Sequence, residues 1–232
     1  MFGSPSVLER ITIHGTFITT SVCIRFVSIV KNLGFRLDSG LTFSQQVKNL
    51  KQSCFHKLRN IAKMKKYLSC SQMSTLTQAL IISSLDYCNA LYFGVEGSVI
   101  NQLQAIQNRA CRVIFGLKKR ESTTPYLKKL HWLRIQERIE FKALMLVFKC
   151  LNGLAPVYLS ELFRYNFISG SRAPSLQTSI TKSAKGTRAF QNYAARLWND
   201  LPCAIKQSTS LGEFKSRLKT HLFLRSYNEY ID

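Results

Sequence analysis

Carboxylates are the side chains on which catalysis by this sequence would depend, and they are sparse. Asp86, in the segment SSLDYCNALYFG, is the only carboxylate between Asp38 and Glu96. Two-metal polymerases and nucleases need two or three carboxylates that converge on the cations. The sequence contains no DD, DxD, ExD or YxDD motif. We therefore expect Asp86 to stabilise the scaffold, through a bond within a helical turn or to a nearby Arg.

The two acids that lie closest together in the sequence are also predicted to have a structural role and not a catalytic one. Glu137 and Glu140 lie three residues apart beside Arg134, Arg138 and Lys142, a spacing that favours surface ion pairs along one helix. The chain has no GxSxG, HExxH or P-loop motif. Scattered residues leave a Ser-His-Asp or Cys-His arrangement open, but no motif marks one. We expect no catalytic residue, no metal site, no cofactor and no enzymatic activity from this chain alone.

The charge of the chain predicts a polyanionic partner. Lys and Arg number 33 against 12 Asp and Glu, which gives a formal net charge of +21. Such a charge opposes a compact fold through self-repulsion unless a polyanion neutralises it. The cations are spread along the chain, as they are on surfaces that follow a phosphate backbone. Nucleic acid is the predicted partner, whether RNA, DNA or their hybrid. The alternatives are an acidic membrane surface and a basic protein without a specific partner.

Cysteines and apolar runs indicate the compartment. The seven Cys are scattered without a CxxC pair and the four His stand alone, a pattern typical of free thiols in a reducing compartment. Pro5, Glu9 and Arg10 interrupt any signal-peptide core in the first residues. The longest apolar runs, such as ALMLVF, are too short to span a bilayer. We expect an intracellular protein, nuclear or cytoplasmic, that is neither secreted nor bound to a membrane.

The elements that would position these side chains change character near residue 40. Residues 1–40 are rich in β-branched residues, with a predicted hairpin at His14–Gly15 and a second strand pair in IVKNLGFRLDSGL, where Asp38 is a turn residue. From residue 42 apolar residues recur at helical spacing, and Ser44 is the predicted N-cap. Further helices are predicted over 71–93, 98–115, 135–151 and in the last 45 or so residues, with a linker or weak strands over 165–187. The predicted fold is mainly α, with a small β-rich N-terminus.

One helical face carries only positive charge. At 100° per residue, Lys48, Arg59, Lys63 and Lys66 fall within an arc of about 60°, and no acid lies between residues 39 and 85. A solvated helix face usually mixes both signs, so this face is predicted to meet phosphate. An ordinary exposed face is the alternative. More cations lie at the end of the 98–115 helix, where they also complement the helix dipole. The predicted nucleic-acid-binding residues are Lys48, Arg59, Lys63, Lys66, Arg109, Arg112, Lys118, Lys119 and Arg120.

Several motifs, in order along most of the chain, resemble a known family. They are SIVKNLGFRLDSGLTFSQQV, ALIISSLDYCNALYFG, LQAIQNRACRVIFG, TPYLKKLHWLRIQERIEFKALMLVFKCLNGLAPVYLSELF, GTRAFQNYAARLWNDLPCAI and LGEFKSRLKTHLF. Together they resemble the C-terminal part of the reverse transcriptases of LINE-type (non-LTR) retrotransposons of the jockey-like group. Any one of these motifs is a weak signal, and their shared order is the stronger one.

The resemblance implies a thumb and downstream region of an RNA-directed DNA polymerase. Its parts would be the edge of the palm (1–40), a thumb-like helical region (41–120), a helical extension (121–164), a linker or weak strands (165–186) and C-terminal helices (187–232). The catalytic aspartates of the family would lie upstream, so no catalytic residue carries over to this chain. The expected function is a truncated fragment that retains template–primer backbone binding. The alternatives are part of an active reverse transcriptase whose catalytic domain is separate, or a non-functional relic.

Overall fold

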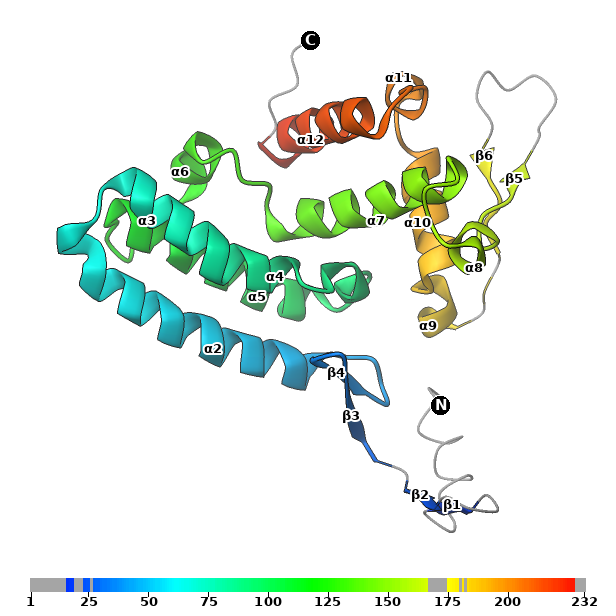
Figure 1. The fold of residues 1–232 in the computed structure, drawn as a ribbon, viewed down its shortest axis with the longest axis horizontal. Coiled ribbons are helices and arrows are strands. Elements are labelled where there is room, and N and C mark those ends of the chain that lie inside the picture. Colours follow the sequence, from blue (N-terminus) through cyan, green and yellow to red (C-terminus); the bar gives the residue numbers. More distant parts are fainter. Residues whose placement is uncertain are drawn as a thin grey trace.

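The computed structural model describes residues 16–18, 23–25, 27–166, 175–179, 181 and 183–227 (Figure 1). It is mainly helical with short antiparallel ribbons, which confirms the predicted fold class. None of the helices in these ranges is both long and apolar enough to cross a bilayer. The helices are α2 (Ser44–Lys63), α3 (Cys70–Thr77), α4 (Ser83–Asp86), α5 (Gly97–Phe115), α6 (Thr124–Lys129), α7 (Ile135–Leu151), α8 (Val157–Ser160), α9 (Ala184–Thr187), α10 (Phe190–Asn199), α11 (Cys203–Lys206) and α12 (Leu211–Tyr227). Shorter turns are η2 (Met64–Tyr67), η3 (Gln78–Ile82) and η4 (Asn89–Tyr92).

The strands form three two-stranded antiparallel ribbons. The second predicted strand pair is confirmed: β3 (Ile29–Asn32) pairs with β4 (Phe35–Asp38) across a turn in which both central residues have positive φ. Before it, β1 (Thr16–Ile18) pairs with β2 (Cys23–Arg25). The turn predicted at His14–Gly15 lies outside the described residues. The weak strand pair expected after residue 164 is present as β5 (Tyr165–Asn166) and β6 (Ser175–Leu176).

Asp38 connects the β3–β4 ribbon to the first long helix. Its carboxylate accepts the backbone N–H of Thr42 at 2.9 Å and of Phe43 at 2.6 Å. Phe43 occupies the N-cap position in a left-handed conformation without a side-chain cap, so the prediction that Ser44 is the N-cap was wrong. The more distant carboxylate of Asp38 serves the free backbone donors at this helix start instead. Asp38 is a turn residue, as predicted, and it also organises the start of α2.

We expect Asp38→Ala to lower the free energy of unfolding by about 1 kcal/mol, the usual cost of losing a helix cap. Burial alone would raise the pKa of Asp38, but the N–H groups of Thr42 and Phe43 outweigh it and lower the pKa below 3.8. A depressed pKa contributes stability that is present above the unfolded pKa and lost as the pH falls through the folded pKa. Chemical denaturation should therefore show the difference between wild type and Asp38→Asn shrinking below about pH 4. A difference independent of pH would contradict this role.

The helices follow the predicted apolar stripes closely but break in one place. The predicted long helix over Ile135–Leu151 is α7, and the predicted C-cap at Gly116 has the left-handed φ of 72°. The predicted helix over 71–93 is instead α3, the π-helical turn η3, α4 and then η4. Cys88 has a φ of 52°, which no α-helix continues through. This break turns η4 toward α7.

Two apolar clusters form the core, and α7 belongs to both. The first cluster lies between α2, α3 and α5 and reaches the start of α7 through Ile135 and Ile139. The second cluster lies between α7, α10 and α12, with Leu144, Val147 and Phe148 from α7. Packing therefore continues across residue 120, where the resemblance places a boundary. The helix α7 is the element that the two clusters share.

The last described residue returns to the first cluster. Tyr227, at the end of α12, is buried among residues of that cluster. Its hydroxyl donates a hydrogen bond to the backbone carbonyl of Trp132 at 2.6 Å. Desolvation raises the pKa of the Tyr227 phenol to about 12, so it stays a neutral donor over the physiological range. The C-terminal helix is thus fastened to both clusters.

Candidate nucleic-acid interface

The predicted basic residues of α2 lie on its solvent-facing side. Val47, Cys54, Leu58 and Ile61 are buried in the first cluster. The cations Lys48, Arg59 and Lys63 of the same helix are exposed, and Lys66 is exposed in the following turn η2. Lys48 and Arg59 are eleven positions apart on the helix, roughly 16 Å along its axis. The face is therefore a track along α2 rather than one compact cluster.

Packing of α2 against α5 brings cations of the two helices together. Arg59 from α2 and Arg109 from α5 border a recess of about 320 Å³ together with Phe55. Both arginines are exposed. Neither guanidinium has a hydrogen-bond or ion-pair partner within the described part of the chain. Two unpaired guanidinium groups over a concave surface suit a phosphate, because each can donate in a planar fork.

The end of α5 lies beside η2. The Nζ of Lys65 occupies the space that a Cβ of residue 116 would need, so only glycine fits there with Lys65 in place. Lys65 thus approaches the carbonyl end of α5, where the helix dipole favours a cation. The exposed run Lys118 to Arg120 follows directly after Gly116. The structure therefore joins the η2 and α5 groups of cations that the sequence placed far apart.

Arg112 has a structural role that its sequence position did not reveal. It is partly buried, and its Nη2 donates to the backbone carbonyl of Glu121 at 3.2 Å. The Glu121 carboxylate in turn accepts the backbone N–H of Lys118 at 3.0 Å. These bonds hold the turn after α5 in one conformation. Arg112 is therefore engaged within the protein, while Lys118, Lys119 and Arg120 remain exposed on the turn that it orders.

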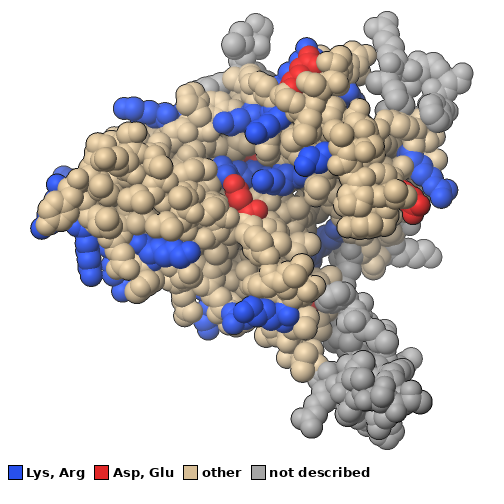
Figure 2. Space-filling model, in the orientation of Figure 1, with Lys and Arg blue, Asp and Glu red and all other residues tan. Residues whose placement is uncertain are grey.

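The surface distribution of charge matches these placements. Figure 2 shows Lys and Arg along the lower edge and at the left end of the molecule, where α2 and α3 meet in Figure 1. Red atoms are few over this face. Blue atoms also border a hollow near the middle of the same view, next to some of the few acids. The positive surface thus has two separate concentrations on the side shown.

The expectation that Asp86 stabilises the scaffold is met by its contacts. Its two carboxylate oxygens accept from Nε and Nη2 of Arg138 on α7, at 2.8 Å and 2.5 Å. Asn89 donates to the same carboxylate at 3.4 Å. The alternative bond to Ser83 is not formed, since the hydroxyl of Ser83 donates to the carbonyl of Ala79. Asp86 therefore ties α4 to α7.

Glu137 and Glu140 do not form the surface ion pairs that their spacing suggested. Glu140 is buried and accepts from Arg225 of α12, and also from Gln136 at 3.0 Å. Glu137 is partly buried, and burial raises its pKa, with the nearby Glu140 charge acting in the same direction. The prediction of surface pairs was wrong because it could not foresee that α12 covers this side of α7. Over the described ranges, no three His, Cys, Asp or Glu side chains gather as a metal site would require.

Sequence reasoning missed a second group of cations. Lys142 and Lys149 on α7 and Lys215 and Lys219 on α12 line two adjoining pockets. The spacing of four between Lys215 and Lys219 marks one helical face. Nothing in the linear order indicates that this face meets α7. Only the packing of α12 against α7 brings the two helices together.

Comparisons with known proteins add no relative. No protein-family model, no curated protein and no solved structure matches the chain. The resemblance to non-LTR reverse transcriptases therefore stays a prediction from the motifs.

Proposed function

We propose that this chain binds nucleic acid through phosphate contacts made by a basic face of α2, η2, α5 and the turn after α5. The observation that carries the proposal is the pair of unpartnered guanidinium groups, Arg59 and Arg109, at one recess. The exposed Lys63, Lys66 and Lys118 to Arg120 extend this positive surface at the η2 end. Contacts of this kind give affinity and register without reading the base sequence.

The motif resemblance gives this binding a biological setting. We propose that the chain corresponds to the thumb and downstream region of a non-LTR retrotransposon reverse transcriptase, where such a face would hold a template–primer duplex. The proposal assigns no catalytic step to the chain. Asp86 is assigned a structural role because both of its oxygens contact Arg138.

The test is the salt dependence of binding to a labelled RNA–DNA hybrid by the full chain. Each phosphate contact contributes about 0.9 to the slope of log K against log salt concentration on a duplex. We expect Arg59→Ala with Arg109→Ala to lower the magnitude of that slope by about 1.8. Lys63→Ala with Lys66→Ala should lower it by a similar amount.

The matched control removes the same charge elsewhere. Lys31→Ala with Arg164→Ala takes two exposed cations from outside the proposed face, and it should leave the slope near the wild-type value. Heparin serves as a polyanion competitor without bases or duplex geometry. The proposal fails if the control pair and the Arg59–Arg109 pair change the slope equally, or if heparin binds as tightly as the hybrid.

A further inference from the structure

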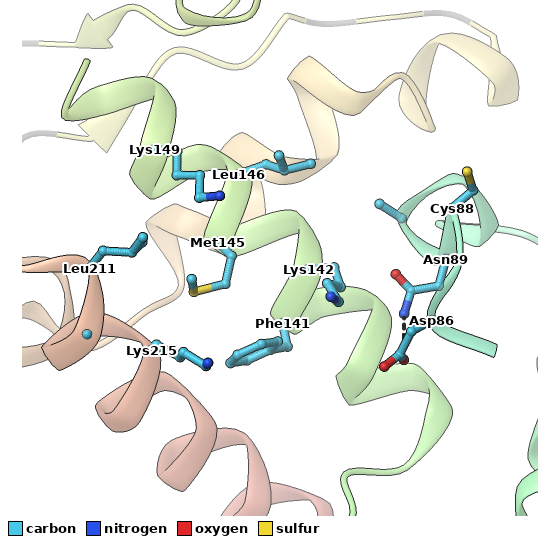
Figure 3. A pocket seen from close by; sticks show the side chains of 12 residues that line it. Asp86, Cys88, Asn89, Phe141, Lys142, Met145, Leu146, Lys149, Leu211 and Lys215 are labelled. Carbon is cyan, nitrogen blue, oxygen red and sulfur yellow. Dashed lines mark hydrogen bonds between the residues drawn. The ribbon is translucent and has the colours of Figure 1, made fainter. Parts of the chain in front are cut away.

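A groove runs along the outer side of α7, between α12 and the segment from α4 to η4. Two adjoining pockets of about 580 Å³ and 410 Å³ form it, and Asp86, Phe141, Lys142 and Lys215 line both. In Figure 3 the side chains of α7 lie between those of α12 and those of the Asp86–Asn89 segment. The larger pocket alone has the size of a small-molecule site. The groove shares no residue with the face proposed above.

Cations border this groove on two helices. Lys142 and Lys149 project from α7, and Lys215 and Lys219 project from α12. Their ammonium groups have no hydrogen-bond or ion-pair partner among the residues that the structure describes. Arg138 also lines the groove, but Asp86 neutralises it. The groove therefore keeps an uncompensated positive charge on both of its helical walls.

Apolar side chains lie between the cations. Phe141 and Met145 are one helical turn apart on α7 and are only partly buried, and Leu211 faces them from α12. The second cluster covers one side of these residues and leaves the other side open to the groove. An open aromatic ring between two rows of lysines offers a stacking surface within reach of phosphate-binding groups.

Hydrogen-bonding groups line the side of the groove formed by the segment from α4 to η4. The carboxylate of Asp86 and the amide of Asn89 lie beside the apolar residues, and Asp86 is the single carboxylate among the lining residues described. Carboxylate and amide oxygens accept hydrogen bonds from exocyclic amino groups of bases. An acidic peptide would satisfy the lysines, but its carboxylate side chains would offer no hydrogen-bond donor to the Asp86 carboxylate or the Asn89 amide oxygen.

We infer that this groove binds a single-stranded segment of nucleic acid. Phosphates would contact the lysines of α7 and α12, while an unpaired base lies against Phe141 with its polar edge toward Asp86 and Asn89. A duplex exposes its phosphates but keeps its bases stacked inside, so it would leave Phe141 without a role. The site therefore differs in ligand from the α2–α5 face and stands independently of it.

The test uses the full chain and a labelled single-stranded oligonucleotide of mixed sequence, about 12 nucleotides long. Lys142→Ala with Lys215→Ala should lower the magnitude of the salt slope by about 1.4, since each phosphate contributes about 0.7 on single strands. Phe141→Leu keeps an apolar side chain but removes the ring, and it should weaken binding by roughly tenfold or more. Both lysines are exposed, so their variant tests the inference even if Phe141→Leu fails to fold.

The controls separate this site from the proposed face. Binding of the RNA–DNA hybrid should keep its wild-type slope in the Lys142–Lys215 variant, and single-strand binding should keep its slope in the Arg59–Arg109 variant. The Lys31–Arg164 variant corrects for net charge alone. The inference is overturned if a folded Phe141→Leu variant binds the oligonucleotide like wild type. It is also overturned if polyglutamate displaces the strand as well as an unlabelled oligonucleotide does, or if only the Arg59–Arg109 variant loses single-strand binding.

Discussion

Phe214→Ala is expected to lower the free energy of unfolding by about 3 to 5 kcal/mol, the range for removing a fully buried aromatic ring. The ring of Phe214 is fully buried in the second cluster. It stacks on Phe148 with centroids 4.3 Å apart and lies 5.8 Å from the ring of Trp198. Alanine would leave a cavity between α7, α10 and α12 that these rings cannot close without leaving their own contacts.

The measurement is thermal unfolding followed by circular dichroism. For a chain of this size the loss corresponds to a drop in Tm of roughly 6 to 20 °C. Leu154→Ala is the control, because Leu154 is 57% exposed and its truncation should cost no more than about 0.5 kcal/mol. Equal melting temperatures for the two variants would mean that the second cluster is not packed as described.

Asp86→Ala is expected to cost about 2 to 3 kcal/mol, somewhat less than the loss of one partner from a fully buried pair. The side chains of Arg138 and Asp86 are 15% and 24% exposed, so the stranded guanidinium would be only partly hydrated. The double variant Asp86→Ala with Arg138→Met should recover most of the loss, because an apolar side chain needs no partner there.

Urea unfolding of the two single variants and the double variant gives the coupling between the residues. Arg217→Ala serves as the comparison, since it removes a more exposed ion pair with Glu213 and an exposed hydrogen bond to the Ala204 carbonyl, and it should cost about 1 kcal/mol or less. If the double variant is as unstable as the sum of its single variants, the pair does not stabilise the junction of α4 with α7. Asp86 would then need another role.

The sequence allowed local structure to be predicted well where one physical signal dominated. The apolar stripe of α7 gave its bounds, and Gly116 marked the end of α5, because these signals act within a turn or two of helix. The start of α2 was predicted to within a residue, but its capping group was not, because the cap comes from Asp38, outside the helix. The break at Cys88 was missed because a left-handed non-glycine residue is held there by tertiary packing and not by propensity.

The candidate site was predictable only as separate helical faces. The cations of α2 follow from their angular spacing, but the meeting of Arg59 with Arg109 depends on how α2 packs on α5. In the sequence Arg112 cannot be distinguished from the other basic residues near the end of α5. Its hydrogen bond to the Glu121 carbonyl forms only because of the path that the chain takes after α5. The groove cations were missed for the same reason, because long-range packing decides which faces meet.

The return of Tyr227 to the carbonyl of Trp132 has a consequence for how the chain folds during synthesis. Helices α2 to α6 leave the ribosome well before α12, yet their core includes the Tyr227 ring. A nascent chain that ends before α12 therefore carries an incomplete first core and an exposed apolar side of α7. Such a chain is open to aggregation or chaperone capture until α12 emerges. The first core is therefore completed only after α12 has been synthesised.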